Sequence, residues 1–119
     1  MDPRIDQAQR YIDNNMDKKV SLKSISKLSS LGYSYFSALF KKEVGICFSK
    51  YVKQKRMAQA KYLLESTSTE IKIISYSVGY KYLSNFHHDF KRLTGTTPLK
   101  FRENSHIANL ANKIEKPNN

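Results

Sequence analysis

Apolar residues recur along this chain at intervals of three and four positions, which is the spacing of amphipathic helices. The pattern predicts an all-α fold, because no stretch alternates cleanly between apolar and polar residues and no Asn-Gly or Asp-Gly hairpin turn occurs. No proline interrupts residues 4–97, so long helices are permitted there. The predicted helices cover residues 3–16, 33–44, 48–65, 70–77 and 82–94. A short helix with Leu22, Ile25 and Leu28 on one face is predicted after the first, and a short seventh helix is predicted to begin at Pro98.

The same spacing predicts which side chains face a core and which residues begin and end the helices. Residues 103–119 have helical spacing but frequent asparagine, and they are expected to form either an extra helix or a frayed tail. The predicted N-caps are Ser21, Thr69 and Thr97, and the predicted stops are Gly45, Gly79 and Gly95. The predicted inward residues are Ile5, Ala8, Tyr11, Ile12, Met16, Leu22, Ile25, Leu28, Phe36, Leu39, Phe40, Tyr51, Val52, Met57, Ala60, Leu63, Leu64, Ile71, Ile74, Val78, Leu83, Phe86, Phe90 and Phe101.

An internal repeat is the strongest signal in the sequence. A shift of 50 residues places residues 34–45 on residues 84–95, and both segments read S-x-F-x-x-x-F-K-[KR]-x-x-G. Each copy combines a short helix, a brief connection and a longer helix, which together form a helix-turn-helix unit. The predicted organisation is therefore a first subdomain at 1–47, a linker helix at 48–65, a second subdomain at 66–102 and a C-terminal extension at 103–119.

The two copies differ between the paired phenylalanines. The first copy has Ser37-Ala38-Leu39 where the second has His87-His88-Asp89. We interpret these positions as outward-facing residues with which the two units read different targets. The alternative is simple drift on a solvated surface.

The charge of the chain favours an anionic partner. The 119 residues include 21 Lys and Arg against 10 Asp and Glu, a net charge of +11, and residues 48–102 alone hold 11 basic and 3 acidic groups. Such an excess suits nucleic acid, an acidic membrane surface or an acidic protein. The longest apolar run is three residues, which is too short for a membrane-spanning helix or the core of a signal peptide. We expect a cytoplasmic protein, in keeping with its single cysteine.

Enzymatic and metal chemistry find no support in the motifs. The sequence contains no glycine-rich phosphate loop, no HExxH and no CxxC. His87 and His88 are adjacent, so on a helix they point about 100° apart and cannot easily share one metal ion. Cys47 is interpreted as a small packing residue rather than a nucleophile. We therefore expect no enzyme activity, no cofactor and no metal.

Spaced motifs covering residues 5–102 resemble the DNA-binding domain of the AraC/XylS family of bacterial transcription regulators. The motif of the second unit stands here as Gly79-Tyr80, Ser84, Phe86, Phe90, Lys91-Arg92, Gly95, Pro98, Phe101 and Arg102, and the linker motif as Tyr51, Arg56, Met57, Ala60, Leu63 and Leu64. The resemblance implies seven helices, with two helix-turn-helix units joined by the long fourth helix. It also implies sequence-specific binding to double-stranded promoter DNA, with activation as the usual outcome.

The length of the linker helix agrees with that geometry. Eighteen residues give a helix of about 27 Å, which approaches the roughly 34 Å of one DNA turn once the docked helices are added. One monomer is therefore expected to cover two adjacent major grooves. RNA polymerase is a candidate second partner, and no membrane partner is expected. Because family members often carry a sensor or receiver domain before this one, the chain is either a stand-alone regulator or a piece of a larger one.

The resemblance also implies which side chains contact DNA. Family members often have Arg where Ala38 stands and Ser where Gly32 stands, so guanine readout by the first unit is expected to be weak. Arg56 either braces the linker or contacts DNA. The implied base-reading residues are Tyr33, Ser34, Ser37, Ala38, Lys41, Leu83, Ser84, Asn85, His87 and His88. The implied phosphate contacts are Tyr35, Lys42, Lys53, Lys81, Lys91 and Arg92.

Two other functions remain open at this point. The chain could be a helical adaptor that binds an acidic protein surface, or a DNA-binding module without sequence readout. Comparing promoter DNA with random DNA separates the three, because a specific reader should prefer its site by roughly a thousandfold or more.

Overall fold

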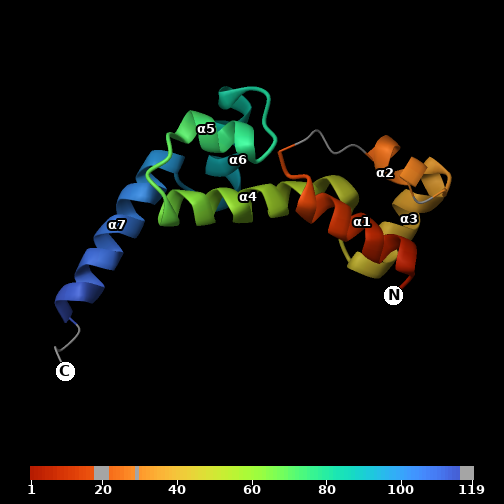
Figure 1. Cartoon of the computed structure of the whole chain (residues 1–119), viewed down its shortest axis with the longest axis horizontal. Coiled ribbons are helices and arrows are strands. Elements are labelled where there is room, and N and C mark those ends of the chain that lie inside the picture. The colour runs from red at the N-terminus through yellow and green to blue at the C-terminus, as the bar shows by residue number, and fades with distance from the viewer. Residues whose placement is uncertain (18–21, 29, 116–119) are drawn as a thin grey trace. The chain divides into compact units, whose positions relative to one another are not determined.

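The computed structural model describes residues 1–17, 22–28 and 30–115, and within these ranges the chain forms seven helices and no strand (Figure 1). The all-α prediction is therefore confirmed. The chain divides into two compact units, Met1–Arg56 and Met57–Asn119, and α4 contributes to both. The helices are α1 Pro3–Asn14, α2 Leu22–Leu28, α3 Tyr33–Val44, α4 Phe48–Ser66, α5 Ile71–Ser77, α6 Leu83–Thr94 and α7 Pro98–Glu115.

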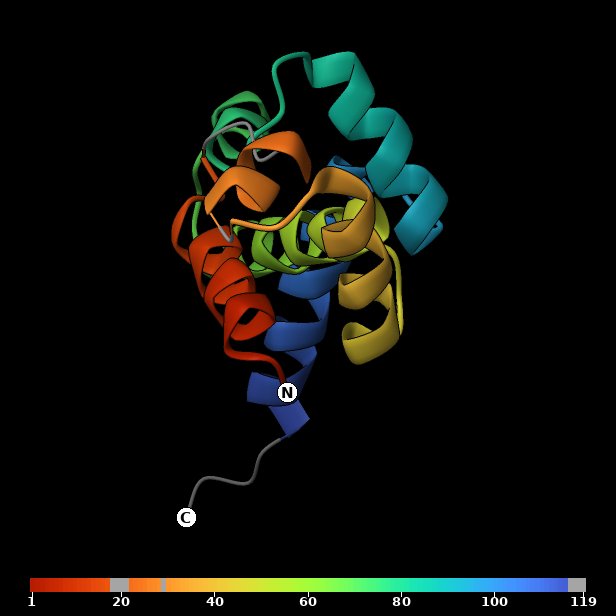
Figure 2. The same cartoon turned by 90° about the vertical axis from the view of Figure 1, so that its right-hand side faces the viewer.

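The first unit is built from α1, α2, α3 and the beginning of α4. Helices α2 and α3 contact each other (Figure 2). Helix α1 also packs against α3. The core of this unit is formed by the buried residues Ile5, Ala8, Ile12, Ile25, Phe36, Phe40, Phe48, Tyr51 and Val52.

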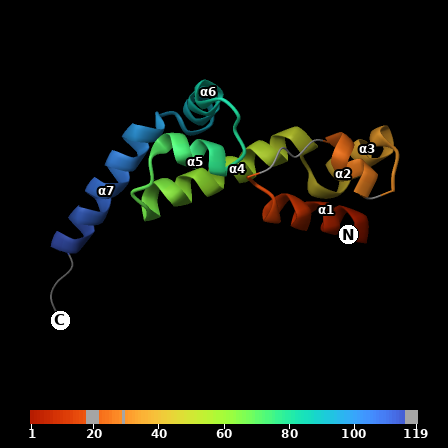
Figure 3. The ribbon, with the colours of Figure 1, turned by 45° about the horizontal axis from the view of Figure 1, so that its top comes forward.

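The second unit repeats this arrangement with the end of α4 and with α5, α6 and α7. Helix α6 contacts both α5 and α7, and α5 lies alongside the later part of α4 (Figures 1 and 3). The core is formed by the buried residues Met57, Ala60, Leu64, Ile74, Val78, Phe86 and Phe90.

The sequence repeat has a matching geometry in the aromatic cores. Phe36 and Phe40 have ring centroids 6.0 Å apart, and the second pair, Phe86 and Phe90, lies 5.7 Å apart. The second ring of each pair meets an edge-on partner, Tyr51 at 5.3 Å in one unit and Phe101 at 5.6 Å in the other. Such edge-to-face contacts add to the free energy of burying the rings.

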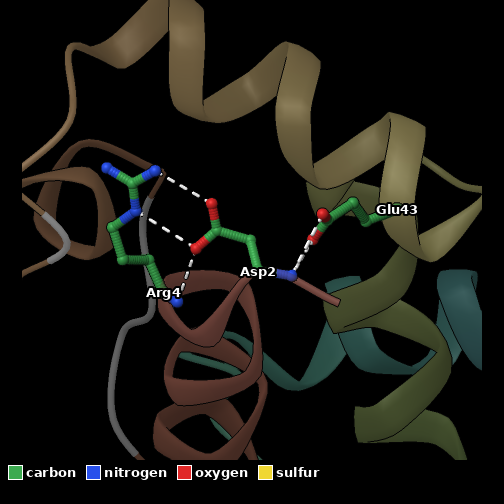
Figure 4. Close-up of polar contacts among 3 residues, drawn as sticks. All are labelled: Asp2, Arg4 and Glu43. Atoms are coloured by element: carbon green, nitrogen blue, oxygen red, sulfur yellow. Dashed lines mark hydrogen bonds and ion pairs between the residues drawn. The ribbon is translucent and has the colours of Figure 1, made fainter.

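The first helix is held at its start by its own cap. Asp2 precedes α1, and its carboxylate accepts hydrogen bonds from the backbone N–H and the side chain of Arg4, while Glu43 of α3 accepts the Asp2 backbone N–H at 3.0 and 3.1 Å (Figure 4). The contacts with Arg4 lower the pKa of the Asp2 carboxyl from 3.8 to about 2, chiefly through the side-chain hydrogen bond and then through the backbone N–H. The charged form of Asp2 therefore favours the folded state.

Three predicted details are wrong. The cap of α5 is Glu70 rather than Thr69, whose backbone N–H instead bonds the Thr67 hydroxyl oxygen. Tyr11 lies at the margin of the apolar stripe of α1 and is 37% exposed. Helix α7 is not short, because it continues unbroken through most of the extension (Figures 1 and 3). Its asparagines lie on exposed faces, where helix propensity costs only tenths of a kcal/mol per residue.

Other boundary predictions hold. The hydroxyl oxygen of Thr97 accepts the Lys100 N–H at 3.2 Å, as an N-cap should, and Gly45 and Gly95 end α3 and α6 with φ of 94° and 83°. The predicted cap at Ser21, and residues 116–119 of the predicted extension, lie outside the described residues.

Two buried serines occupy matching places in the repeat. The hydroxyl of Ser26 donates to the carbonyl of Lys23 at 2.9 Å. The hydroxyl of Ser75 is fully buried and has no hydrogen-bond partner among the described residues. Burying a hydroxyl without a partner costs free energy, so Ser75 destabilises the second unit.

We predict that Ser75→Ala raises the free energy of unfolding by about 1 kcal/mol, because it removes an unpaired buried hydroxyl and keeps the volume nearly unchanged. Urea unfolding followed by far-UV circular dichroism measures this. Ser26→Ala is the matched control and should leave stability unchanged or lower it. A loss of stability in Ser75→Ala would contradict the prediction and indicate a bound water on this hydroxyl.

We also predict that the carboxyl of Asp2 titrates near pH 2, as followed by its NMR chemical shift, and that Arg4→Gln moves the midpoint back toward 3.8. Because the folded-state pKa lies below the unfolded value, the stabilisation is complete above about pH 4 and is lost as the pH falls toward 2. A midpoint near 3.8 in the unmodified chain would show that the contact with Arg4 does not persist in solution.

Candidate nucleic-acid interface

The buried phenylalanines set the rotation of the two candidate reading helices, α3 and α6. In each helix the two phenylalanines, which are four residues apart, face the core. A stripe of side chains on the opposite side of the helix therefore remains accessible. The stripe of α3 contains Ser34, Ser37, Ala38 and Lys41, and the stripe of α6 contains Ser84, His87, His88 and Lys91. Ser37 and His87 are half-buried at the stripe edges, and the other six residues are exposed.

The remaining predicted base readers lie beside these stripes. Tyr33 is exposed, and so is Tyr35, a predicted phosphate contact. The two lie on opposite flanks of α3, since two residues of helix turn through about 200°. Asn85 is exposed on α6, at the position that matches Tyr35 in the repeat. Leu83 is half-buried and packs against the core of the second unit. This packing alone explains an apolar residue at position 83, without a DNA contact.

Basic side chains gather at the C-terminal ends of both helices. Lys41 and Lys42 lie in the last turn of α3, and Lys91 and Arg92 take the same places in α6. All four are exposed. Because Lys41 and Lys91 are equivalent in the repeat, the same kind of contact is expected of both.

Two further predicted phosphate contacts, Lys81 and Lys53, come from different elements. Lys81 is exposed in the turn before α6, and its ammonium lies 5.4 Å from the ring centroid of Tyr82. Lys53 is half-buried on α4. The ammonium of Lys81 is therefore accessible to a phosphate, and the ammonium of Lys53 is less accessible.

The turns that orient the reading helices differ between the copies. Ser30 in the first unit and Gly79 in the second hold the same left-handed position, with φ of 61° and 97°. A side chain is strained in this region and glycine is not. The residue that follows is Leu31 in one turn and Tyr80 in the other, and both pack against their cores.

The interpretation of positions 39 and 89 as outward-facing is wrong, whereas the prediction from helical spacing that Leu39 faces inward is confirmed. Leu39 packs against the first core, and the Asp89 side chain is only 14% exposed. The carboxylate of Asp89 accepts a hydrogen bond from the Tyr80 hydroxyl at 2.8 Å, and it lies 3.5 Å from Nδ1 of His88. The helical position of residue 89, at the border of the core stripe, indicates partial burial but does not identify Tyr80 as the partner.

Of the two arginines in the family motifs, Arg102 bonds the protein backbone and Arg56 is buried. Arg56 is 9% exposed and belongs to the buried part of α4, which favours its role as a brace over DNA contact. The guanidinium of Arg102 donates to the carbonyls of Leu64 and Thr67 at 3.1 and 3.2 Å. Arg102 thereby satisfies carbonyl groups at the end of α4 that have no partner within the helix.

The packing role expected for Cys47 is wrong, because this residue is exposed. It corresponds to Thr97 in the repeat and directly precedes α4, where the Lys50 backbone N–H lowers the pKa of its thiol. Among the described residues no group of three or more His, Cys, Asp and Glu side chains could hold a metal ion. None of the described helices is both long and apolar enough to cross a membrane.

Comparison with known proteins supports the assignment of two helix-turn-helix units to this chain. A family model described as a helix-turn-helix domain matches residues 25–104. The chain is 32% identical over 103 residues to the arabinose operon regulatory protein of Escherichia coli, and 34% identical over 113 residues to the regulatory protein PocR of Salmonella typhimurium. These matches cover 86% and 92% of this chain but 35% and 37% of the two relatives, so the chain spans about a third of their length.

A solved structure agrees with these relatives. The C-terminal domain of AraT, a response regulator from Geobacillus stearothermophilus, superposes with a TM-score of 0.83 at 30% identity, covering 86% of this chain and 85% of that one. The sequence motifs, the paired helix-turn-helix units and these similarities together show that the chain belongs to the AraC/XylS family of bacterial transcription regulators and corresponds to their DNA-binding domain.

Proposed function

We propose that this chain binds double-stranded promoter DNA in a sequence-specific manner, with α3 and α6 each entering a major groove. The observation that carries the proposal is the repeated stripe of accessible residues on each helix, which ends in a pair of basic side chains. Hydrogen-bonding groups in such a stripe suit base edges, and cations at its end suit the phosphates beside the groove.

The two stripes suit different base sequences. The second stripe contains two imidazoles and Ser84, which can donate to guanine or to phosphate oxygens. The first stripe contains two serines and Ala38, whose methyl group suits the methyl group of thymine. We therefore infer an asymmetric target site, with stronger discrimination in the half that α6 reads.

The finer parts of the proposal concern the biological setting. We infer that one copy of the domain suffices to cover two successive major grooves, that bound protein activates transcription through RNA polymerase, and that it acts in the cytoplasm. The regulatory names of the relatives support a role in transcription. No catalytic step is part of this proposal.

An unbiased selection of DNA sites by the purified domain at about 150 mM salt tests the proposal. We predict enrichment of two short sequence blocks about one helical turn apart, because each helix reads one groove. Enrichment of a single block would contradict readout by both units. Binding without enrichment would contradict sequence readout and favour a non-specific DNA-binding module, and absence of DNA binding would favour an adaptor for acidic proteins.

We further predict that Lys91→Ala weakens binding to all DNA sequences by a similar factor, because a lysine on a phosphate carries no base information. The slope of log K against log salt concentration should fall in magnitude by about one. Lys113→Ala is the control, since it removes the same charge from the exposed end of α7 and should leave the slope unchanged. A changed base preference in Lys91→Ala would instead make Lys91 a base reader.

A further inference from the structure

Asp89 joins three neighbours on the second reading helix. Its Oδ2 accepts the Tyr80 hydroxyl at 2.8 Å. Its Oδ1 lies 3.5 Å from Nδ1 of His88 and 3.9 Å from Nη2 of Arg92. One carboxylate therefore contacts the turn, a candidate base reader and a candidate phosphate contact at the same time.

We propose that Asp89 is a positioning residue that sets the sequence specificity of α6: it holds the His88 imidazole for base reading and restrains Arg92 from non-specific phosphate contact. This inference rests on the proposed function. The proposal assigns Asp89 no DNA contact of its own, because its side chain is only 14% exposed.

The first argument is the orientation of His88. Its side chain is 77% exposed, so without a partner the imidazole is free to sample several rotamers. A carboxylate beside Nδ1 favours the orientation in which Nε2 points away from Asp89. Fixing a side chain before binding reduces the entropy lost on binding, and that gain applies only to the sequence that matches the fixed geometry.

The second argument is the electrostatic cost of an acidic group here. A carboxylate on a helix that faces DNA repels phosphates and weakens binding to every sequence. The corresponding residue of α3 is Leu39, which packs against its core without any charge. An apolar residue at this position can therefore brace a reading helix in this fold. A bracing role alone does not explain why position 89 is an aspartate.

These two arguments predict effects of opposite sign for Asp89→Asn. The amide keeps the shape of the side chain, and its oxygen can still accept the Tyr80 hydroxyl, so the fold should persist. Affinity for random DNA should rise by up to about fivefold at 0.15 M salt, the effect of about one released counterion. The ratio of affinities for selected and random DNA should fall by about fivefold or more, the usual discrimination of one base contact.

A double-mutant cycle with His88→Ala isolates the positioning role. In the His88→Ala background, Asp89→Asn should no longer change base preference, because the group that it positions is absent. Glu103→Gln is the charge control, since it removes an exposed carboxylate from α7 of the same unit. It should leave the affinity ratio unchanged.

The alternatives give distinct results. If Asp89→Asn lowers affinity for both DNAs together with the melting temperature, Asp89 is only a brace and the inference is overturned. If both affinities rise equally, the effect is one of net charge and the inference is again overturned. If the unmodified chain shows no preference before any substitution, the proposed function fails and this inference fails with it.

Discussion

The burial of two phenylalanines four residues apart determines which side of each reading helix remains accessible. Phe36 and Phe40 in α3, and Phe86 and Phe90 in α6, are fully buried. A helix whose paired rings must both enter a small core has only one rotation about its axis, and that rotation decides which side chains remain accessible. The glycines that follow end both helices at the same distance from the second ring, so the basic pair stands in the last turn of each.

Around this shared core the two units are braced by different chemistry. The first unit uses apolar contacts from Leu31 and Leu39, whereas the second uses the hydrogen bond between Tyr80 and Asp89. The left-handed position in the turn costs less in the second unit, where glycine fills it, than in the first, where Ser30 does. The repeat therefore conserves the geometry of the helices while leaving each turn free to change in composition.

Much of the fold could be predicted from the sequence, because helix periodicity, capping residues and the repeat are local signals. The bounds of α3 and the cap at Thr97 follow from them directly. The length of α7 could not, since weak helix formers such as asparagine are tolerated once Pro98 and Phe101 have anchored the first turn. The role of Asp89 was also missed, because its polar type suggested solvent and only the position of Tyr80 in space shows its hydrogen-bond donor.

The placement of acidic groups links the charge of the chain to its specificity. Each reading helix contains one carboxylate, and neither carboxylate belongs to the accessible stripe. Glu43 accepts the backbone N–H of Asp2, and Asp89 accepts the Tyr80 hydroxyl. Neither stripe therefore contains a carboxylate, and the cations at the end of each stripe attract any DNA. On the proposed function, discrimination between sequences must then come from how rigidly the few hydrogen-bonding side chains are held. In α6 we infer that this rigidity depends on Asp89, whose carboxylate lies 3.5 Å from Nδ1 of His88 and is itself only 14% exposed.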